Sequence, residues 1–123
     1  MSWTYQQSTG NLTAPDGTLA GQGYSGNGAD LDNPAAEDVI GHGPIPRGGW
    51  TIGAFGDHPI LGPFSAPLLP VAGNDMDGRD GGFFIHGDNA QLNHTASDGC
   101  IILARPLRQA IADSGDNSLQ VIA

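Results

Sequence analysis

The sequence predicts a single, mainly β domain with one short C-terminal helix, and three observations support this class. The chain has 123 residues, the length of one domain. Its 20 glycines and 9 prolines separate short apolar runs, as is typical of a loop-rich β protein. Residues 105–114 carry the start signal, apolar face and stop signal of a helix. We therefore expect one domain over residues 1–123.

Turn residues divide the first half of the chain into short segments. Alternating residues predict a meander of three strands, at 2–7, 11–14 and 18–24. The Pro-Asp-Gly turn at 15–17 supports it, because proline presets φ and glycine supplies a positive φ. Residues 25–43 are mostly polar and predict a long loop with one helical turn near 35–39. The run Gly-Pro-Ile-Pro-Arg-Gly-Gly at 43–49 predicts a rigid turn.

The second half predicts one helix and five further strands, at 50–55, 64–71, 82–86, 101–103 and 118–123. Three prolines in or just before the second of these place it at a sheet edge or make it irregular, because proline cannot donate to a strand ladder. In the helix, Pro106 suits the first turn and Gly115 is a stop signal. Its apolar face consists of Leu107, Ala110 and Ile111. Its arginines, Arg105 and Arg108, are expected on the outer face, in solvent.

Charge and hydropathy argue against several classes of partner. The net charge is −9 with four lysines and arginines in total, whereas nucleic acids and anionic membranes attract basic surfaces. No apolar run approaches the ~20 residues that insert into and span a membrane. The first residues lack the basic and apolar regions of a signal peptide, so we expect synthesis in the cytoplasm without one. The one cysteine cannot form an internal disulfide.

The residues best suited to catalysis lie in two neighbouring segments. His86 ends an apolar run, and Cys100 begins the next one after a polar loop at 88–97. Adjacent strands joined by such a loop can bring these ends together. A thiol is mostly protonated at pH 7, so a cysteine nucleophile needs a base, and His86 is the nearest candidate in sequence. Gly99 leaves space for a carbonyl substrate, and the N–H groups around Gly99 and Cys100 could hold an oxyanion.

These two segments resemble the active-site motif of the L,D-transpeptidases of the YkuD type. The resemblance rests on Ile-His-Gly at 85–87 and on Ser-Asp-Gly-Cys-Ile at 97–101. Further motifs are similar to the compact branch that bacteria export by type VI secretion as antibacterial effectors. They are Trp-x-Tyr at 3–5, Gly-Tyr-Ser-Gly at 23–26, Asn-Pro at 33–34, Gly-Pro-Ile-Pro-x-Gly at 43–48 and His-Gly-Asp at 86–88.

The resemblance implies a β-rich catalytic domain and an acyl-enzyme mechanism without a cofactor. The thiolate of Cys100 would attack the diaminopimelate carbonyl of a peptidoglycan tetrapeptide stem and expel the terminal D-Ala, with His86 as the base. Water would complete an L,D-carboxypeptidase reaction, whereas a D-amino acid or a stem amine would give exchange or crosslinking. Such an effector acts in the target-cell periplasm, and its expected partners are stem peptides and a cognate immunity protein.

The resemblance also implies roles for residues around the catalytic pair. Ser97 and Gly99 would shape the nucleophile loop. Candidates to bind substrate are Tyr24, Ser25, Gly87, Asp88 and Arg79, with a packing role equally open for Tyr24.

The chain departs from the larger family's motif on both sides of the Gly-Cys pair. Asp98 stands in place of a histidine, and Ile102 in place of an arginine. We expect the Asp98 side chain to face solvent, because a carboxylate beside the thiol would oppose its ionisation. The missing arginine leaves Arg79 and Arg47 as the available cations for stem carboxylates.

Other interpretations stay open. A cysteine amidase or endopeptidase could cut peptidoglycan elsewhere, although papain-like enzymes usually place cysteine before histidine in the chain. A non-catalytic wall-binding or metal-holding module would keep its function when the thiol is blocked. Metal-ligand atoms occur in His86, Asp88, His94 and Cys100, but their spacing matches no common zinc pattern, so we expect no metal. The remaining histidines expected at the surface are His42 and His58, and the aromatic residues expected in the core are Trp3, Tyr5, Trp50 and Phe55.

Overall fold

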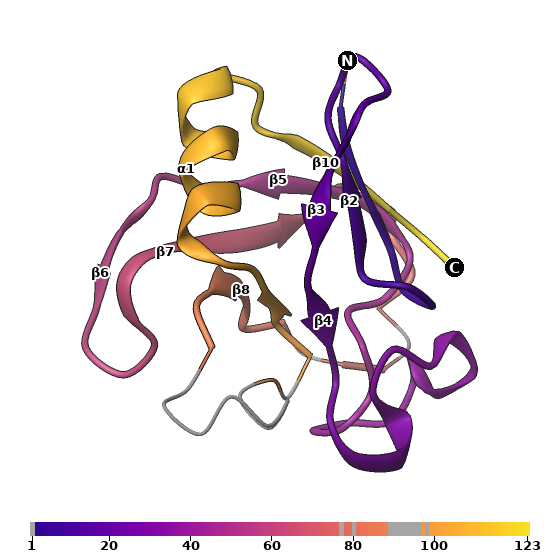
Figure 1. Ribbon diagram of the computed structural model, residues 1–123. Helices are drawn as coiled ribbons and strands as arrows, with labels where there is room; N and C mark the ends of the chain where they lie inside the picture. The colour runs from indigo at the N-terminus through magenta and orange to yellow at the C-terminus, as the bar shows by residue number, and fades with distance from the viewer. Residues whose placement is uncertain (1, 77, 80, 89–96, 98) are drawn as a thin grey trace.

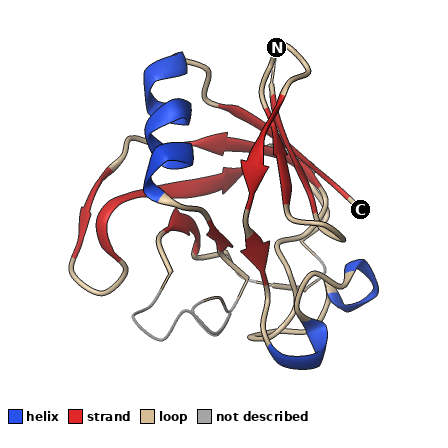
Figure 2. Cartoon of the chain, viewed as in Figure 1, coloured by secondary structure: helices blue, strands red, loops and turns tan. Residues whose placement is uncertain are grey.

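The fold is one nearly closed β-sheet with a single α-helix packed against it (Figure 1). The computed structural model describes residues 2–76, 78–79, 81–88, 97 and 99–123. Strands dominate these residues, which confirms the mainly β class (Figure 2). The strands are β1 (Trp3–Gln6), β2 (Asn11–Thr13), β3 (Leu19–Gln22), β4 (Tyr24–Ser25), β5 (Gly48–Ile52), β6 (Gly56–His58), β7 (Gly62–Pro70), β8 (Phe83–His86), β9 (Ile101–Ile102) and β10 (Ser118–Ile122).

The strand order shows how the sheet nearly closes on itself. The order is β3-β2-β1-β10-β5-β7-β8-β9-β4, and β6 pairs with β7 outside this path. β3 and β4 stand at opposite ends of the order, yet only Gly23 separates them in the chain. A Cβ at Gly23 would lie 2.1 Å from the Ile102 carbonyl oxygen, so a side chain does not fit where the chain crosses between the two ends. The single strand expected at 18–24 is therefore two strands.

The two terminal strands lie side by side. β1 pairs with β10 in parallel, with Trp3 opposite Leu119, and β10 pairs on its other side with β5. β1, β2 and β3 form the antiparallel meander that the sequence predicts. The last strand therefore joins the meander to the rest of the sheet.

β7 lies in the middle of the sheet, which corrects the expectation of an edge strand, while the φ of 54° at Phe64 and the shifted register against β6 agree with the alternative of an irregular strand. It runs for nine residues and pairs with β5, β6 and β8. Its prolines have no N–H to donate, but two of their carbonyl groups accept hydrogen bonds. The Pro67 carbonyl accepts from the Gly53 N–H at 2.8 Å, and the Pro63 carbonyl accepts from Arg108.

The helix α1 (Arg105–Ser114) has the expected bounds and ends at Gly115 in the left-handed conformation, with φ of 70°. Its buried residues are Arg108 and Ile111, while Ala110 is exposed. Arg108 is therefore a correction, because the expected surface arginine is only 8% exposed. Its donors reach backbone carbonyls of other elements, which makes its burial possible.

The core lies between the sheet and α1. It contains the expected Trp3, Tyr5 and Trp50, with Phe55 packed against it partly buried. The loop at 25–43 holds two short 3-10 helices, η1 (Gly28–Asp30) and η2 (Pro34–Ala36), of which the second lies close to the expected helical turn. In the described part of the chain, no helix has the length and apolar character needed to cross a membrane.

Candidate active site

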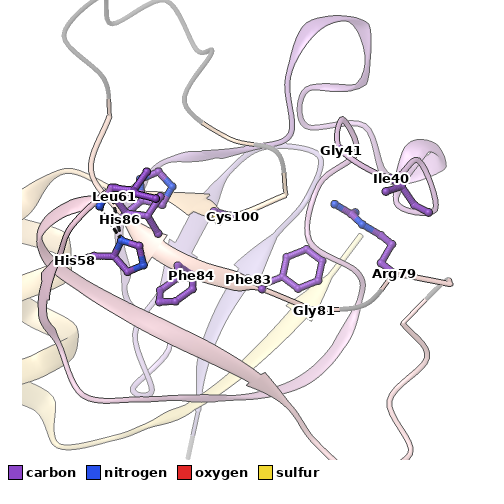
Figure 3. A pocket seen from close by; sticks show the side chains of 12 residues that line it. Ile40, Gly41, His58, Leu61, Arg79, Gly81, Phe83, Phe84, His86 and Cys100 are labelled. Atoms are coloured by element: carbon purple, nitrogen blue, oxygen red, sulfur yellow. Dashed lines mark hydrogen bonds between the residues drawn. The ribbon is translucent and has the colours of Figure 1, made fainter.

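Cys100 and His86 line one pocket of about 420 Å³. His86 ends β8 and Cys100 immediately precedes β9, and these strands pair in parallel with His86 opposite Ile102. Side chains two positions apart in a strand point to the same face, so Cys100 and His86 share a face on a diagonal across the two strands. The other lining residues are Ile40, Gly41, His58, Ile60, Leu61, Arg79, Gly81, Gly82, Phe83 and Phe84 (Figure 3).

The two nitrogens of His86 differ in their surroundings. The Nδ1 atom lies 2.8 Å from the Gly87 carbonyl oxygen, which can only accept, so the proton is on Nδ1. The Nε2 atom is buried and has no hydrogen-bond partner among the described residues. In this tautomer Nε2 carries a lone pair. The imidazole is therefore set to accept a proton at Nε2.

The environment of His86 favours its neutral form. Burial is the largest influence and lowers the pKa of His86 below its ordinary value of 6.5. The Arg108 cation and, less strongly, His58 also lower this pKa, while the bond to Gly87 and the Asp88 carboxylate oppose them. A neutral imidazole is the form that can take a proton from a thiol.

Ser97 holds the nucleophile loop together. Its hydroxyl donates to the Cys100 carbonyl and accepts from the N–H groups of Gly99 (3.1 Å) and Gly26 (2.9 Å). The Gly99 N–H therefore has a partner within the loop, and binding an oxyanion there would require this bond to open. This N–H is one of the groups around Gly99 and Cys100 that, from the sequence, could hold an oxyanion.

Gly99 is required by its neighbours as well as by its backbone. Its φ is +132°, a conformation that residues with a side chain rarely adopt. A Cβ would lie 2.3 Å from Nη2 of Arg79 and 2.8 Å from Cε1 of Phe83. The space that Gly99 leaves is therefore occupied on this side by Arg79 and Phe83.

The Gly-Tyr-Ser-Gly motif supports this loop from β4. Ser25 is fully buried, and its hydroxyl donates to the Gly99 carbonyl at 3.1 Å and accepts from the Ile45 N–H at 2.9 Å. Tyr24 donates to Oδ1 of Asp88 at 2.6 Å. Tyr24 and Asp88 line a second pocket of about 400 Å³, which Cys100 does not line. The structure thus places these three candidates outside the set of residues that line the pocket of Cys100 and His86.

Arg79 does line the pocket with Cys100, at the end away from His86 (Figure 3). Its Nη1 donates to the carbonyls of Glu37 (3.0 Å) and Pro44 (2.7 Å), and its guanidinium lies 4.8 Å from the centre of the Phe83 ring. It therefore ties the loop before β5 to the nucleophile loop. The other expected cation, Arg47, forms an exposed ion pair with Glu37 at 2.6 Å and does not line the pocket.

Arg108 is a site residue that the sequence did not reveal. A Cβ at Gly87 would lie 2.8 Å from Nη2 of Arg108, so the guanidinium packs against the residue whose carbonyl holds His86. Its Nε donates to the Leu103 carbonyl at 3.0 Å, and its Nη1 to the Phe64 carbonyl at 2.9 Å. No local signal distinguishes it from a solvent-exposed helix arginine.

His58, which the sequence places at the surface, is half-buried and also lines the pocket. The described residues contain no cluster of three or more His, Cys, Asp or Glu side chains that could hold a metal ion. The predictions for Asp98 and His94 concern positions outside the described residues.

Comparisons with known proteins agree with this fold. A family model described as the Tlde1 domain matches residues 20–122. No curated protein sequence matches the chain. The crystal structure of the helical cell shape determining protein Pgp2 from Campylobacter jejuni has a similar fold, with a TM-score of 0.62 and 20% sequence identity. The match covers 98% of this chain and 46% of that one, so the chain spans less than half the length of the Pgp2 structure.

Proposed function

The chain belongs to the Tlde1 domain family, and from this membership we propose that it is an L,D-carboxypeptidase and L,D-transpeptidase with a cysteine nucleophile. The family is one of type VI secretion effectors, which indicates peptidoglycan as the target. One observation carries the proposal: His86, whose Nε2 has no hydrogen-bond partner among the described residues, lines the same pocket as Cys100. That is the arrangement of a base beside a nucleophile.

The first half of the proposed reaction forms a thioester. Nε2 of His86 takes the thiol proton, and the thiolate of Cys100 attacks the diaminopimelate carbonyl carbon of a tetrapeptide stem. When the tetrahedral intermediate collapses, the carbon–nitrogen bond to D-Ala breaks, and the imidazolium gives its proton to the leaving amine. The Gly87 carbonyl keeps its bond to Nδ1–H throughout and stabilises the imidazolium.

The second half discharges the thioester. Water gives a proton to His86 and attacks the thioester carbonyl, which releases a tripeptide carboxylate and returns the proton to the Cys100 sulfur. A free D-amino acid can attack in place of water, and the product is then a tetrapeptide with a new terminal residue. Cys100 is half-buried and lines the pocket, which supports access for both acceptors.

The experiment is mass analysis of muropeptides from sacculi incubated with purified protein and D-Met. We expect tripeptides and D-Met-substituted tetrapeptides from the unaltered protein and neither product from Cys100→Ala or His86→Ala. The double variant should be no worse than either single one, because the two residues act as one unit. His42→Ala is the matched control, since His42 is exposed and does not line the pocket.

Two results would contradict the proposal. Activity in Cys100→Ala would remove the covalent mechanism. Cleavage at the glycan–peptide amide or at the D-Glu–diaminopimelate bond, with tetrapeptide ends intact, would favour the amidase or endopeptidase alternative.

A further inference from the structure

His58 is fixed in the pocket by the turn that it caps. Its Nδ1 accepts from the N–H groups of Ile60 (3.1 Å) and Leu61 (3.0 Å), which join β6 to β7. Both bonds need the lone pair on Nδ1, so the proton of the neutral ring is on Nε2. The ring packs edge to face on Phe84, with 5.1 Å between ring centres. His58 therefore presents an oriented N–H donor.

His58 lies at the end of the pocket where the leaving group of the proposed reaction would sit. Figure 3 shows His58 and His86 at one end, Arg79 at the other, and Cys100 between them. In the proposed reaction the leaving amine takes its proton from His86, so the leaving residue lies on the His86 side of Cys100. This is the end that His58 lines.

The arginines of the chain make their contacts away from the end of the pocket that His58 and His86 line. The chain's four basic residues are all arginines. Arg79 lies at the opposite end of the pocket, and Arg47 pairs with Glu37 outside it. Arg105 stacks on the Phe64 ring at 4.3 Å, and Arg108 donates to backbone carbonyls and does not line this pocket. Within the described part of the chain, His58 is thus the donor side chain beside His86 that can meet an anionic group.

We propose that His58 binds the C-terminal carboxylate of the leaving D-residue through its Nε2–H, and so directs the enzyme to the end of the stem. The inference rests on the proposed function and names a subsite for it. The same subsite would take the carboxylate of an incoming D-amino acid during exchange. The turn that holds His58 also carries Ile60 and Leu61, which offer apolar surface for the side chain of the leaving or incoming D-residue.

The test compares two substrates that differ only at this carboxylate. The substrates are a disaccharide-tetrapeptide and the same compound with a C-terminal carboxamide. The informative variant is His58→Asn, because the asparagine oxygen can still accept from the turn N–H groups while the Nε2–H donor is lost. His58→Gln places an amide N–H near the lost donor, and His42→Ala is the matched histidine control.

We expect His58→Asn to lower kcat/KM for the carboxylate substrate about ten- to a hundredfold, the range for one hydrogen bond to a charged group. The carboxamide substrate should change less than about threefold, and His58→Gln should recover part of the loss. Exchange with D-Met should fall similarly, while exchange with D-methioninamide should not.

Equal losses on the two substrates, or no loss on either, would overturn the assignment of His58. These results differ from a failure of the proposed function, in which the unaltered protein would release neither D-Ala from the carboxylate substrate nor D-alaninamide from the carboxamide substrate. Melting temperatures of the variants identify any loss that comes from unfolding of the turn.

Discussion

His86 keeps one nitrogen available for proton transfer because the Gly87 carbonyl occupies the other. That carbonyl belongs to the next residue in the chain, so no distant side chain is needed to set the tautomer. Glycine at 87 matters for a second reason, since its missing Cβ admits the Arg108 guanidinium. At the scale of single residues, the imidazole of His86 is thus oriented by one hydrogen bond, and burial and a nearby cation favour its neutral form.

We predict that activity persists at a lower pH than an ordinary histidine base would allow. Burial and then Arg108 lower the pKa of His86, so the neutral form survives below 6.5. A plot of log kcat/KM against pH should show its acidic limb with a midpoint below 6.5. A midpoint at or above that value would contradict the prediction.

The lowered pKa of His86 also makes the free energy of unfolding depend on pH. The unfolded chain binds the His86 proton more tightly than the folded one, so folding is favoured less as pH falls. The contribution is complete above about pH 6.5 and is lost as pH falls toward the folded-state pKa. His86→Gln, which does not titrate, should lose less unfolding free energy between pH 7 and 5 in urea titrations than the unaltered protein.

At the scale of elements, one arginine connects α1 to two parts of the sheet. Arg108 donates to Leu103, just after β9, and to Pro63 and Phe64 at the beginning of β7. These contacts place the helix beside the strand that ends at His86. They also explain why a helix with a short apolar face packs stably.

We predict that Arg108→Met lowers the free energy of unfolding by at least about 2 kcal/mol, because it leaves buried carbonyls without a charged donor. Arg105→Met should cost less than about 1 kcal/mol, since Arg105 is exposed and makes one ring contact. Chemical denaturation of both variants measures the difference. If Arg108→Met remains folded, the acidic limb of its log kcat/KM profile should move to higher pH, because the cation that lowers the pKa of His86 is lost. Equal stabilities of the two variants and an unmoved limb would contradict the roles of Arg108 in stability and in the pKa of His86.

At the scale of the whole molecule, closure of the sheet brings the functional segments together. The nucleophile loop, the loop before β5 and the β6–β7 turn come from distant parts of the sequence, and all of them line or support one pocket. We propose that the protein acts in the periplasm of a target cell after export, with an immunity protein protecting the producer, since its family is one of type VI secretion effectors.

We predict toxicity when the chain is directed to the periplasm of a susceptible bacterium by an added signal sequence. Peptidoglycan lies outside the inner membrane, so expression in the cytoplasm should leave growth unchanged. Viable counts after induction measure the effect, and periplasmic Cys100→Ala is the matched control. Equal killing from the cytoplasm, or by Cys100→Ala, would indicate another target.

Local signals were sufficient for several predictions. The helix at 105–114 was predictable because proline and glycine mark its two ends within the segment itself. Cys100 and His86 were predictable as a pair because His86 ends β8, Cys100 immediately precedes β9, and one polar loop joins these neighbouring strands. Their shared pocket is confirmed, whereas their catalytic roles remain predictions.

The position of β7 and the surroundings of Arg108 and His58 were not predictable, since they depend on which strands pair across long separations. Three prolines suggested an edge strand, but the carbonyls of Pro63 and Pro67 accept from donors that only the folded chain brings near. The sequence by itself determined most of the element types and the candidate pair of Cys100 and His86, because propensities and turn chemistry act over a few residues. Only the tertiary structure decided what surrounds that pair, because burial, tautomer and pocket shape arise from contacts between distant segments.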